Sequence, residues 1–304
     1  MRKPMRGGKP TPRTPMPKSK PAREIAPDDI EVDAGLAAAL ETLLPETEPV
    51  PGPPEAFSSA LSELHVELDP GDAERLARYI GMLRRGNALM NLTAPCDDEA
   101  MWTRHVLDAL TLLPLLGELP EGAKIIDVGS GGGLPGLPLA IAMPGAAFTL
   151  LEATGKKAAF LREAARVLGL SNVRVVQGRA ESAGQDHREH REAYDGVVSR
   201  AVGRVAMLAE LTVPFMRPGG LTLLIKGQKA DEEIAEAARA FEMLLCTHAG
   251  TVDTPTGRVV VLTKHSRTPR DYPRRDGEPK RMPLGTRPAS SRPVREASGD
   301  SDGA

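Results

Sequence analysis

The chain has few aromatic residues and few cysteines, and both shortages limit what it can do. Aromatic residues make up 3% of its 304 residues, so extensive base stacking on aromatic platforms is not expected. The 2 cysteines need not pair, which agrees with a reducing compartment. The chain also lacks an uninterrupted apolar run of about 18 residues, and its basic N-terminus lacks the apolar core of a secretory signal. These absences predict a cytoplasmic protein without a membrane anchor.

The two ends of the chain differ in composition from its middle. Residues 1–23 are rich in proline and carry basic but no acidic residues, and residues 24–56 turn acidic. An Ala- and Leu-rich patch at 34–44 can form a short helix. Proline-rich, polar segments rarely bury enough apolar surface to fold. We therefore expect a disordered or loosely attached tail, a helical N-terminal extension, a sheet domain and a basic, largely flexible end, over residues 1–56, 57–117, 118–265 and 266–304.

Short apolar runs alternate with amphipathic helix patterns in the second half of the chain. The β-branched runs are 124–128, 147–151, 173–176, 196–198 and 221–225. This alternation is typical of a parallel sheet covered by helices on both faces. Two later runs, 246–252 and 258–263, flank a turn and predict an antiparallel hairpin at the sheet edge. The expected fold class is α/β, with a Rossmann-like, mostly parallel sheet of seven strands.

A glycine-rich loop follows the first of these runs. Residues 124–136 read Lys-Ile-Ile-Asp-Val-Gly-Ser-Gly-Gly-Gly-Leu-Pro-Gly. Gly129, Gly131 and Gly133 allow the chain to turn sharply and to lie against a ligand. Glu152 ends the next apolar run, roughly 20 residues further on, where a carboxylate can accept both hydroxyls of a ribose. The pattern therefore predicts a cofactor that contains adenosine.

The choice of cofactor rests on how the glycine loop begins. Residues 131–136 also match the dinucleotide pattern G-x-G-x-x-G, but that match starts after the chain has already turned. A carboxylate at Asp127 would repel a pyrophosphate, whereas it suits the cationic amino-acid end of S-adenosylmethionine (SAM). We favour SAM, and NAD or a purely structural glycine turn remain alternatives. Together with seven strands and a terminal hairpin, the pattern is typical of class I SAM-dependent methyltransferases.

Motifs outside the glycine loop give the chain a family resemblance. They are Asn91-Leu-Thr93, Arg104-His105-x-x-Asp108, Glu152-x-x-x-Lys156-Lys157, Arg179-Ala-Glu181, Ser199-Arg200-Ala201, Lys226-Gly227 and Tyr272-Pro-Arg-Arg-x-Gly-x-Pro. With these motifs, from about Leu76 to Leu284, the chain resembles the bacterial 16S rRNA guanine-N7 methyltransferase family, also called glucose-inhibited division protein B. One departure is Gly86, where the family often has a tryptophan, so local packing there is expected to differ.

The resemblance implies an enzyme that transfers a methyl group from SAM to N7 of a guanosine. Its implied partner is 16S rRNA or the small ribosomal subunit, and the protein is expected to be a monomer. The family's SAM contacts correspond to Gly129, Leu134, Ala180, Glu181 and Arg200. The glycine pattern and the acidic strand ends add further expected cofactor contacts at Asp127, Ser130, Gly131, Gly133 and Glu152.

Three residues are candidates for positioning the reactants. Arg200 could hold the SAM carboxylate or the O6 atom of guanine, and both roles stay open. Asn91 and His105 precede the sheet, in a region that could fold over the cofactor and touch the base or a phosphate. For His105 a structural role has equal weight, because Asp108 lies within reach at three positions further along the same helical run.

Positive charge is local in this chain. Lys and Arg number 39 against 41 Asp and Glu, with a formal net charge of −2, so the protein is not a globally basic RNA binder. The late basic run 264–281 can contact RNA phosphates, and a folded RNA read by shape and phosphate contacts fits the composition. The predicted RNA contacts are Lys226, Arg274, Arg275, Lys280 and Arg281.

No metal is expected. The insertion 184–192 is rich in His, Arg and Glu and is predicted to be a solvated loop. His187 and His190 have a possible metal spacing, but only flexible carboxylates stand beside them.

The proposed acceptor atom follows from chemistry that the chain lacks. Methylation of pyrimidine C5 needs a thiolate, and neither Cys96 nor Cys246 lies near the fourth or fifth predicted strand end. Methylation of an exocyclic amine commonly uses an Asn/Asp-Pro-Pro-aromatic motif, which is not present after the fourth strand. Guanine N7 carries an in-plane lone pair and loses no proton, so no general base is required. An NAD(P)-dependent oxidoreductase and a non-catalytic RNA-binding protein with this fold remain the alternatives.

Overall fold

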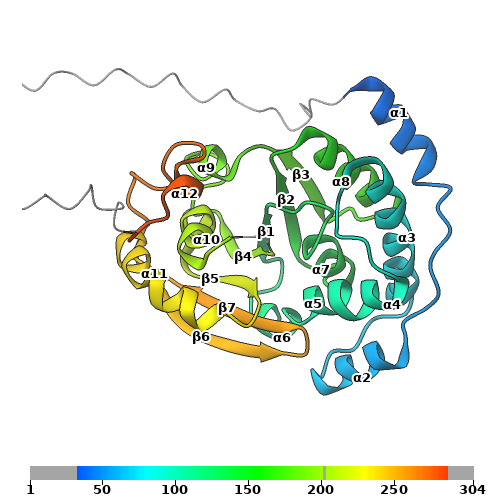
Figure 1. Ribbon diagram of the computed structural model, residues 1–304, viewed down its shortest axis with the longest axis horizontal. Coiled ribbons are helices and arrows are strands. Elements are labelled where there is room, and N and C mark those ends of the chain that lie inside the picture. Colours follow the sequence, from blue (N-terminus) through cyan, green and yellow to red (C-terminus); the bar gives the residue numbers. More distant parts are fainter. Residues whose placement is uncertain (1–32, 201–202, 287–304) are drawn as a thin grey trace, which may run out of the picture.

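A seven-stranded sheet forms the centre of the protein (Figure 1). The computed structural model describes residues 33–200 and 203–286. The strand order is β3-β2-β1-β4-β5-β7-β6, with β7 antiparallel to both β5 and β6 and the other neighbours parallel. The strands are β1 (Lys124–Val128), β2 (Ala147–Glu152), β3 (Val173–Gln177), β4 (Tyr194–Ser199), β5 (Met216–Lys226), β6 (Thr247–Thr254) and β7 (Gly257–Thr263). The predicted α/β class, sheet and terminal hairpin are confirmed.

Helices cover both faces of this sheet. Successive side chains of a strand point to opposite faces, and Ile125 accordingly packs in one apolar cluster while Ile126 packs in the other. The helices after the strands are α7 (Gly136–Ala142), α8 (Gly155–Val167), α9 (Ala180–Ala183), α10 (Val205–Thr212), η2 (Val213–Phe215), α11 (Ala230–Leu244) and α12 (Glu278–Arg281). Residues of α7 and α8 belong to the first cluster, and residues of α10 and α11 to the second. Within the described residues, no helix is long and apolar enough to cross a membrane.

The N-terminal helices pack against the first face. They are α1 (Ala34–Leu43), α2 (Glu55–Glu63), α3 (Asp72–Met90), α4 (Asp98–Ala100), η1 (Met101–Val106), α5 (Leu107–Leu110) and α6 (Leu113–Leu116). The carboxylate of Asp33 caps α1 by accepting a hydrogen bond from the Leu36 amide at 3.1 Å. Leu40 and Leu44 are almost fully buried, and α1 lies beside α8 (Figure 1). Residues 33–56 are thus packed, which differs from the loose tail expected there, because apolar burial outweighs the proline-rich composition. Residues 1–32 of that expected tail lie outside the described part.

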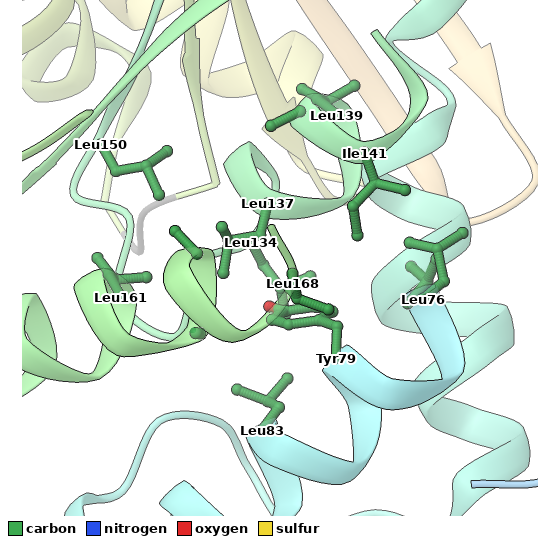
Figure 2. Close-up of a cluster of buried hydrophobic side chains, with 14 of the residues drawn as sticks. Leu76, Tyr79, Leu83, Leu134, Leu137, Leu139, Ile141, Leu150, Leu161 and Leu168 are labelled. Atoms are coloured by element: carbon green, nitrogen blue, oxygen red, sulfur yellow. The ribbon is translucent and has the colours of Figure 1, made fainter. Parts of the chain in front are cut away.

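Helix α3 holds the glycine loop from outside the sheet. The buried hydroxyl of Tyr79 donates a hydrogen bond to the Gly132 carbonyl at 2.9 Å. Figure 2 shows Tyr79 and Leu83 on α3 facing the leucines that follow the glycine loop and those of α8. At Gly86 an added Cβ would lie 2.6 Å from the ring of Phe160. The expected change in packing at Gly86 is therefore explained, since Phe160 occupies the space that a larger residue would need.

The C-terminal segment and the insertion 184–192 are tied together. The buried guanidinium of Arg191 donates to the carbonyls of Gly184, Thr268, Pro269 and Tyr272 at 2.6–3.0 Å. The buried ring of His190 contacts the Tyr194 hydroxyl at 2.8 Å. The prediction of a solvated insertion holds for residues 187–189, which are exposed, but not for His190 and Arg191, which are buried. The flexible end expected from residue 266 is fixed as far as residue 286. Composition gave no sign of this, because the contacts join segments about 80 residues apart.

Candidate active site

Polar residues gather where the parallel strands end. Asp127 lies near the end of β1, Glu152 ends β2, Arg200 follows β4 and Lys226 ends β5. Because β2, β1, β4 and β5 are neighbours in the sheet, these residues share one edge. Open α/β sheets bind ligands at this edge.

The glycine loop forms a tight turn between β1 and α7. Gly129, Gly131 and Gly133 have φ values of 78°, 58° and 99°, which is the region that favours glycine. The Ser130 hydroxyl donates to the Asp127 carbonyl at 3.0 Å and is buried. Its side chain therefore shapes the turn from inside, whereas the sequence predicts Ser130 as a cofactor contact.

Gly131 differs from its neighbours in the space around it. A Cβ at Gly132, Gly133 or Gly136 would lie 2.3–2.6 Å from a leucine side chain. A Cβ at Gly131 would meet only the Gly129 carbonyl, at 3.9 Å. Gly132, Gly133 and Gly136 therefore permit close packing of the protein itself, and Gly131 is the position where the backbone is open to a ligand.

Asp127 is a fully buried carboxylate with an incomplete set of partners. Its Oδ2 accepts a hydrogen bond from the Gly136 amide at 3.1 Å, while Oδ1 has no partner among the described residues. Burial is the main cause that raises the pKa of Asp127 to about 7, and the charge of Glu152 is a smaller cause in the same direction. A nearby cation would favour the ionised form. Asp127 therefore fits the predicted role beside the cationic end of SAM.

Glu152 joins the two loops that would enclose an adenosine. Its Oε2 accepts from the Gly131 amide at 3.0 Å and its Oε1 from the Thr154 amide at 2.8 Å. A carboxylate has about four acceptor positions, so both oxygens can still accept a ribose hydroxyl. The open glycine, the unpartnered carboxylate oxygen and this fixed carboxylate together fit SAM.

The other expected cofactor residues are Leu134, Ala180 and Glu181, and the first two pack on opposite faces of the sheet. Leu134 is buried behind the glycine loop, and Ala180 begins α9. Glu181 is also buried, and its Oε1 accepts from the Gly277 amide at 2.8 Å. The C-terminal segment therefore fixes Glu181, a connection that the sequence gave no signal for.

Arg200 lies at the centre of a hydrogen-bonded network. Its Nε donates to Asp108 Oδ2 at 2.6 Å, and its Nη2 lies 2.8 Å from His105 Nδ1. The hydroxyl of Thr256, in the β6–β7 turn, donates to Asp108 Oδ1 at 2.6 Å. Asp108 and Thr256 were not predicted as site residues. Asp108 stood in a motif, but nothing near Thr256 in the sequence indicated its partner.

His105 is neutral in this network. Burial, followed by the positive charge of Arg200, lowers its pKa to about 4. A guanidinium has only donors, so Nδ1 must accept and the proton of the ring lies on Nε2. The expected contact with Asp108 is absent from the described hydrogen bonds of His105. Instead, both residues hold Arg200.

Asn91 does not join this network. It is exposed at the end of α3, with a left-handed φ of 47°. The nearby Asn87 fixes the segment that follows α3, since Asn87 Oδ1 accepts hydrogen bonds from the amides of Leu92 and Thr93 at 2.6 and 2.9 Å. Thr93 Oγ1 is buried without a partner among the described residues. Within this motif, the Thr93 hydroxyl is therefore the group to which a ligand could hydrogen-bond.

The predicted RNA contacts separate into internal and exposed side chains. Lys226 Nζ donates to the Gly203 carbonyl at 2.5 Å and pairs with Glu233 at 2.8 Å, with 9% of its side chain exposed. Arg274 binds the fully buried Glu210 through Nε and Nη2 at 2.8 and 2.6 Å. Arg274 therefore serves the fold, because releasing it would leave the buried Glu210 carboxylate unpaired. Lys226 is likewise held internally, by the Gly203 carbonyl and by Glu233. The remaining three predicted contacts, Arg275, Lys280 and Arg281, are exposed.

Neither cysteine is prepared to act as a nucleophile. Burial raises the pKa of Cys246 to about 12. Burial and Asp97 also raise the pKa of Cys96. Because the thiolate is the reactive form, the arrangement supports the absence of covalent catalysis.

Comparisons with known proteins agree with this arrangement. A family model for rRNA small subunit methyltransferase G (GidB) matches residues 72–257, more than half of the chain. The ribosomal RNA small subunit methyltransferase G of Sorangium cellulosum is 51% identical over 223 residues, covering 73% of this chain and 92% of that protein. The protein of the same name from Leuconostoc citreum is 38% identical over 236 residues, with 76% and 98% covered. A solved structure of a putative O-methyltransferase from Klebsiella pneumoniae is 18% identical, with a TM-score of 0.46 and 69% and 96% covered. The family model spans both the glycine loop and Arg200.

Proposed function

Because the chain belongs to the rRNA small subunit methyltransferase G family, we propose that it uses SAM to methylate N7 of a guanosine in 16S rRNA. The observation that carries this proposal is the edge of the sheet where Gly131 is open, Asp127 Oδ1 is unpartnered and Glu152 is fixed. A dinucleotide would bring a pyrophosphate to the same loop, beside the buried Asp127 carboxylate, so an NAD-dependent activity is not favoured.

SAM, when bound, supplies an electrophilic methyl group on a sulfonium. The chain's part is to hold the two reactants in line, which in favourable cases lowers a barrier by roughly 7–11 kcal/mol. Asp127 and Glu152 are placed to orient the amino-acid and ribose ends. Arg200 is held by Asp108 and His105, so it can contact a ligand without first becoming ordered.

Guanine N7 is the acceptor that best suits these side chains. The neutral His105 accepts from Arg200 through Nδ1, so that nitrogen is not available as a base. The cysteine thiols are held in their protonated form. An acceptor that already has a lone pair needs neither group.

Contacts with the RNA phosphates are proposed for Arg275, Lys280 and Arg281. They lie at the end of the segment whose Gly277 amide binds Glu181. Bound RNA would therefore lie next to the proposed adenosine side of the site. A monomeric state and a cytoplasmic location stay predictions.

The test is methyl transfer from radiolabelled SAM to 16S rRNA and to small subunits, followed by mapping of 7-methylguanosine. We expect label in one guanosine, and none when that nucleotide is 7-deazaguanosine, which carries carbon in place of N7. Transfer to the 7-deaza substrate would place the methyl group on another atom. A purified protein that binds NAD and not SAM would overturn the proposal as a whole.

A further inference from the structure

A cavity of about 510 Å³ opens beside Arg200 at the ends of β4 and β5. Its charged and polar walls come from separate parts of the chain, namely Asp108, Arg200, Arg204, Lys226, Glu233 and Thr256. Glu233 stands in the first turns of α11 and was not predicted as a site residue. The sequence motif Lys226-Gly227 forms one wall, but its lysine is paired internally.

Most of the charges in the cavity are already neutralised. Arg200 pairs with Asp108 at 2.6 Å, and Lys226 pairs with Glu233 at 2.8 Å. No more than 24% of any of these four side chains is exposed. The third cation, Arg204, pairs with Glu236 at 2.8 Å. A phosphate here would have to compete with these carboxylates for cations that are already paired, which is unfavourable. The cavity suits an uncharged polar group that both donates and accepts hydrogen bonds.

The cavity also lies at the correct distance from the glycine loop for a purine. In the sheet, β4 separates β1 from β5, so Arg200 lies between the glycine loop and Glu233. Neighbouring strands are about 4.8 Å apart, which places the ends of β1 and β5 roughly 10 Å apart. A purine ring with hydrogen-bonding space at each side spans about this length.

Building on the proposed function, we propose that this cavity binds the target guanine, with Glu233 reading its N1–H and 2-amino groups and Arg200 its O6. Glu233 Oε2 accepts from the Val205 amide at 3.0 Å and pairs with Lys226, while Oε1 has no hydrogen bond among those of the described residues. A carboxylate accepts from two adjacent N–H groups, which guanine presents and adenine does not. With that edge at Glu233, N7 lies on the opposite edge of the ring, towards the glycine loop.

The proposal is tested with RNA in which the target guanosine is replaced by inosine. Inosine keeps N1–H, O6 and N7 and lacks only the 2-amino group. We expect wild-type kcat/KM for guanosine to exceed that for inosine by roughly tenfold or more, since a hydrogen bond to a charged group is removed. Glu233→Gln should lower kcat/KM for guanosine and bring the guanosine-to-inosine ratio close to one.

The matched control is Glu232→Gln, on the same helix. Glu232 is exposed and outside the cavity, so its variant should keep the wild-type ratio. Binding of S-adenosylhomocysteine, measured by calorimetry, should be unchanged in both variants. An unchanged ratio in a folded Glu233→Gln protein would overturn the proposal.

If Glu233→Gln does not fold, the wild-type rates on guanosine and inosine still test the proposal. Equal wild-type rates on guanosine and inosine would show that the 2-amino group is not read, and would also overturn the assignment. These outcomes differ from failure of the proposed function, in which wild-type protein would transfer no methyl group to guanosine N7.

Discussion

The glycine loop and the Arg200 cavity lie at the same edge of the sheet, but the chain builds them in different ways. The loop comes from one continuous segment, and its groups are backbone amides and buried carboxylates held by neighbours such as Gly136 and Thr154. The cavity is assembled from side chains up to 148 residues apart, as in the Thr256–Asp108 hydrogen bond. The loop therefore depends on backbone conformation and the cavity on paired charges. Substitutions in the two regions should separate cofactor binding from catalysis.

The largest expected effect is at the open glycine. Gly131→Val should weaken S-adenosylhomocysteine binding by at least roughly 100-fold, because a left-handed residue with a side chain is strained and its Cβ would enter the ligand's space. Calorimetry measures this. The control is Gly145→Ala, at a glycine that also has open space but no positive φ, which should bind normally. Unchanged S-adenosylhomocysteine binding in the Gly131→Val variant would show that the loop has only a structural role.

Arg200→Ala should leave cofactor binding intact and lower kcat/KM by roughly 100-fold, as the loss of a preorganised charged donor does. Arg217→Ala, at the opposite end of β5, is the control and should be active. If S-adenosylhomocysteine affinity falls together with activity, then Arg200 holds the cofactor carboxylate. The glycine loop and the Arg200 cavity would in that case both contribute to cofactor binding.

The pH dependence of cofactor binding should follow Asp127. Burial raises its pKa from 3.8 to about 7, so the unliganded fold retains a proton that the unfolded chain releases. This contribution to stability is present below pH 3.8 and is lost as the pH rises through about 7. A bound cation prefers the ionised form, so affinity for SAM should rise by up to roughly tenfold between about pH 6 and 7.5. Calorimetry on Asp127→Asn should show no such rise; a rise that persists in this variant would assign it to another group.

The exposed basic residues should affect RNA binding alone. Neutralising Arg275, Lys280 and Arg281 should reduce the slope of log affinity against log salt by about 0.7–0.9 for each phosphate that is no longer bound, with cofactor affinity unchanged. Arg274 is left out because it binds Glu210. An unaltered slope would exclude these residues from the interface.

The smallest effect is expected from the cysteines. Cys96→Ala and Cys246→Ala should keep turnover within about twofold, because the raised pKa of each thiol disfavours the nucleophilic thiolate. Thermal unfolding provides the check that each variant is folded. Loss of turnover in a folded variant would indicate covalent catalysis and a different acceptor atom.

The sequence predicted the continuous part of the site and missed the assembled part. Asp127, Gly131 and Glu152 are recognisable because strand periodicity and glycine spacing place them at one edge. The pairing of Arg274 with Glu210, or of Lys226 with Glu233, depends on tertiary contacts that a charge pattern does not contain. Lys226 and Arg274 were therefore predicted to contact RNA from their local positive charge, although the fold pairs both with internal carboxylates.

The same limit applies to the ends of the chain. The helix at 34–44 was visible in its Ala and Leu content, but its docking through Leu40 and Leu44 was not. The first five strands were found because each contains a short apolar run between helix patterns, and the last two because they flank a turn. How the last segment closes on the insertion 184–192 could not be read from either segment separately.

The four carbonyls around Arg191 also bear on the order in which the chain can fold during its synthesis. Three of the four belong to residues 268–272, which leave the ribosome after every strand of the sheet. Until they arrive, a guanidinium buried in the finished protein has only the Gly184 carbonyl among these partners. Glu181, on the expected adenosine side, likewise lacks the hydrogen bond from the Gly277 amide until that residue has been synthesised. A nascent chain whose strands have all left the ribosome therefore still lacks part of its candidate active site until residues 268–277 have followed.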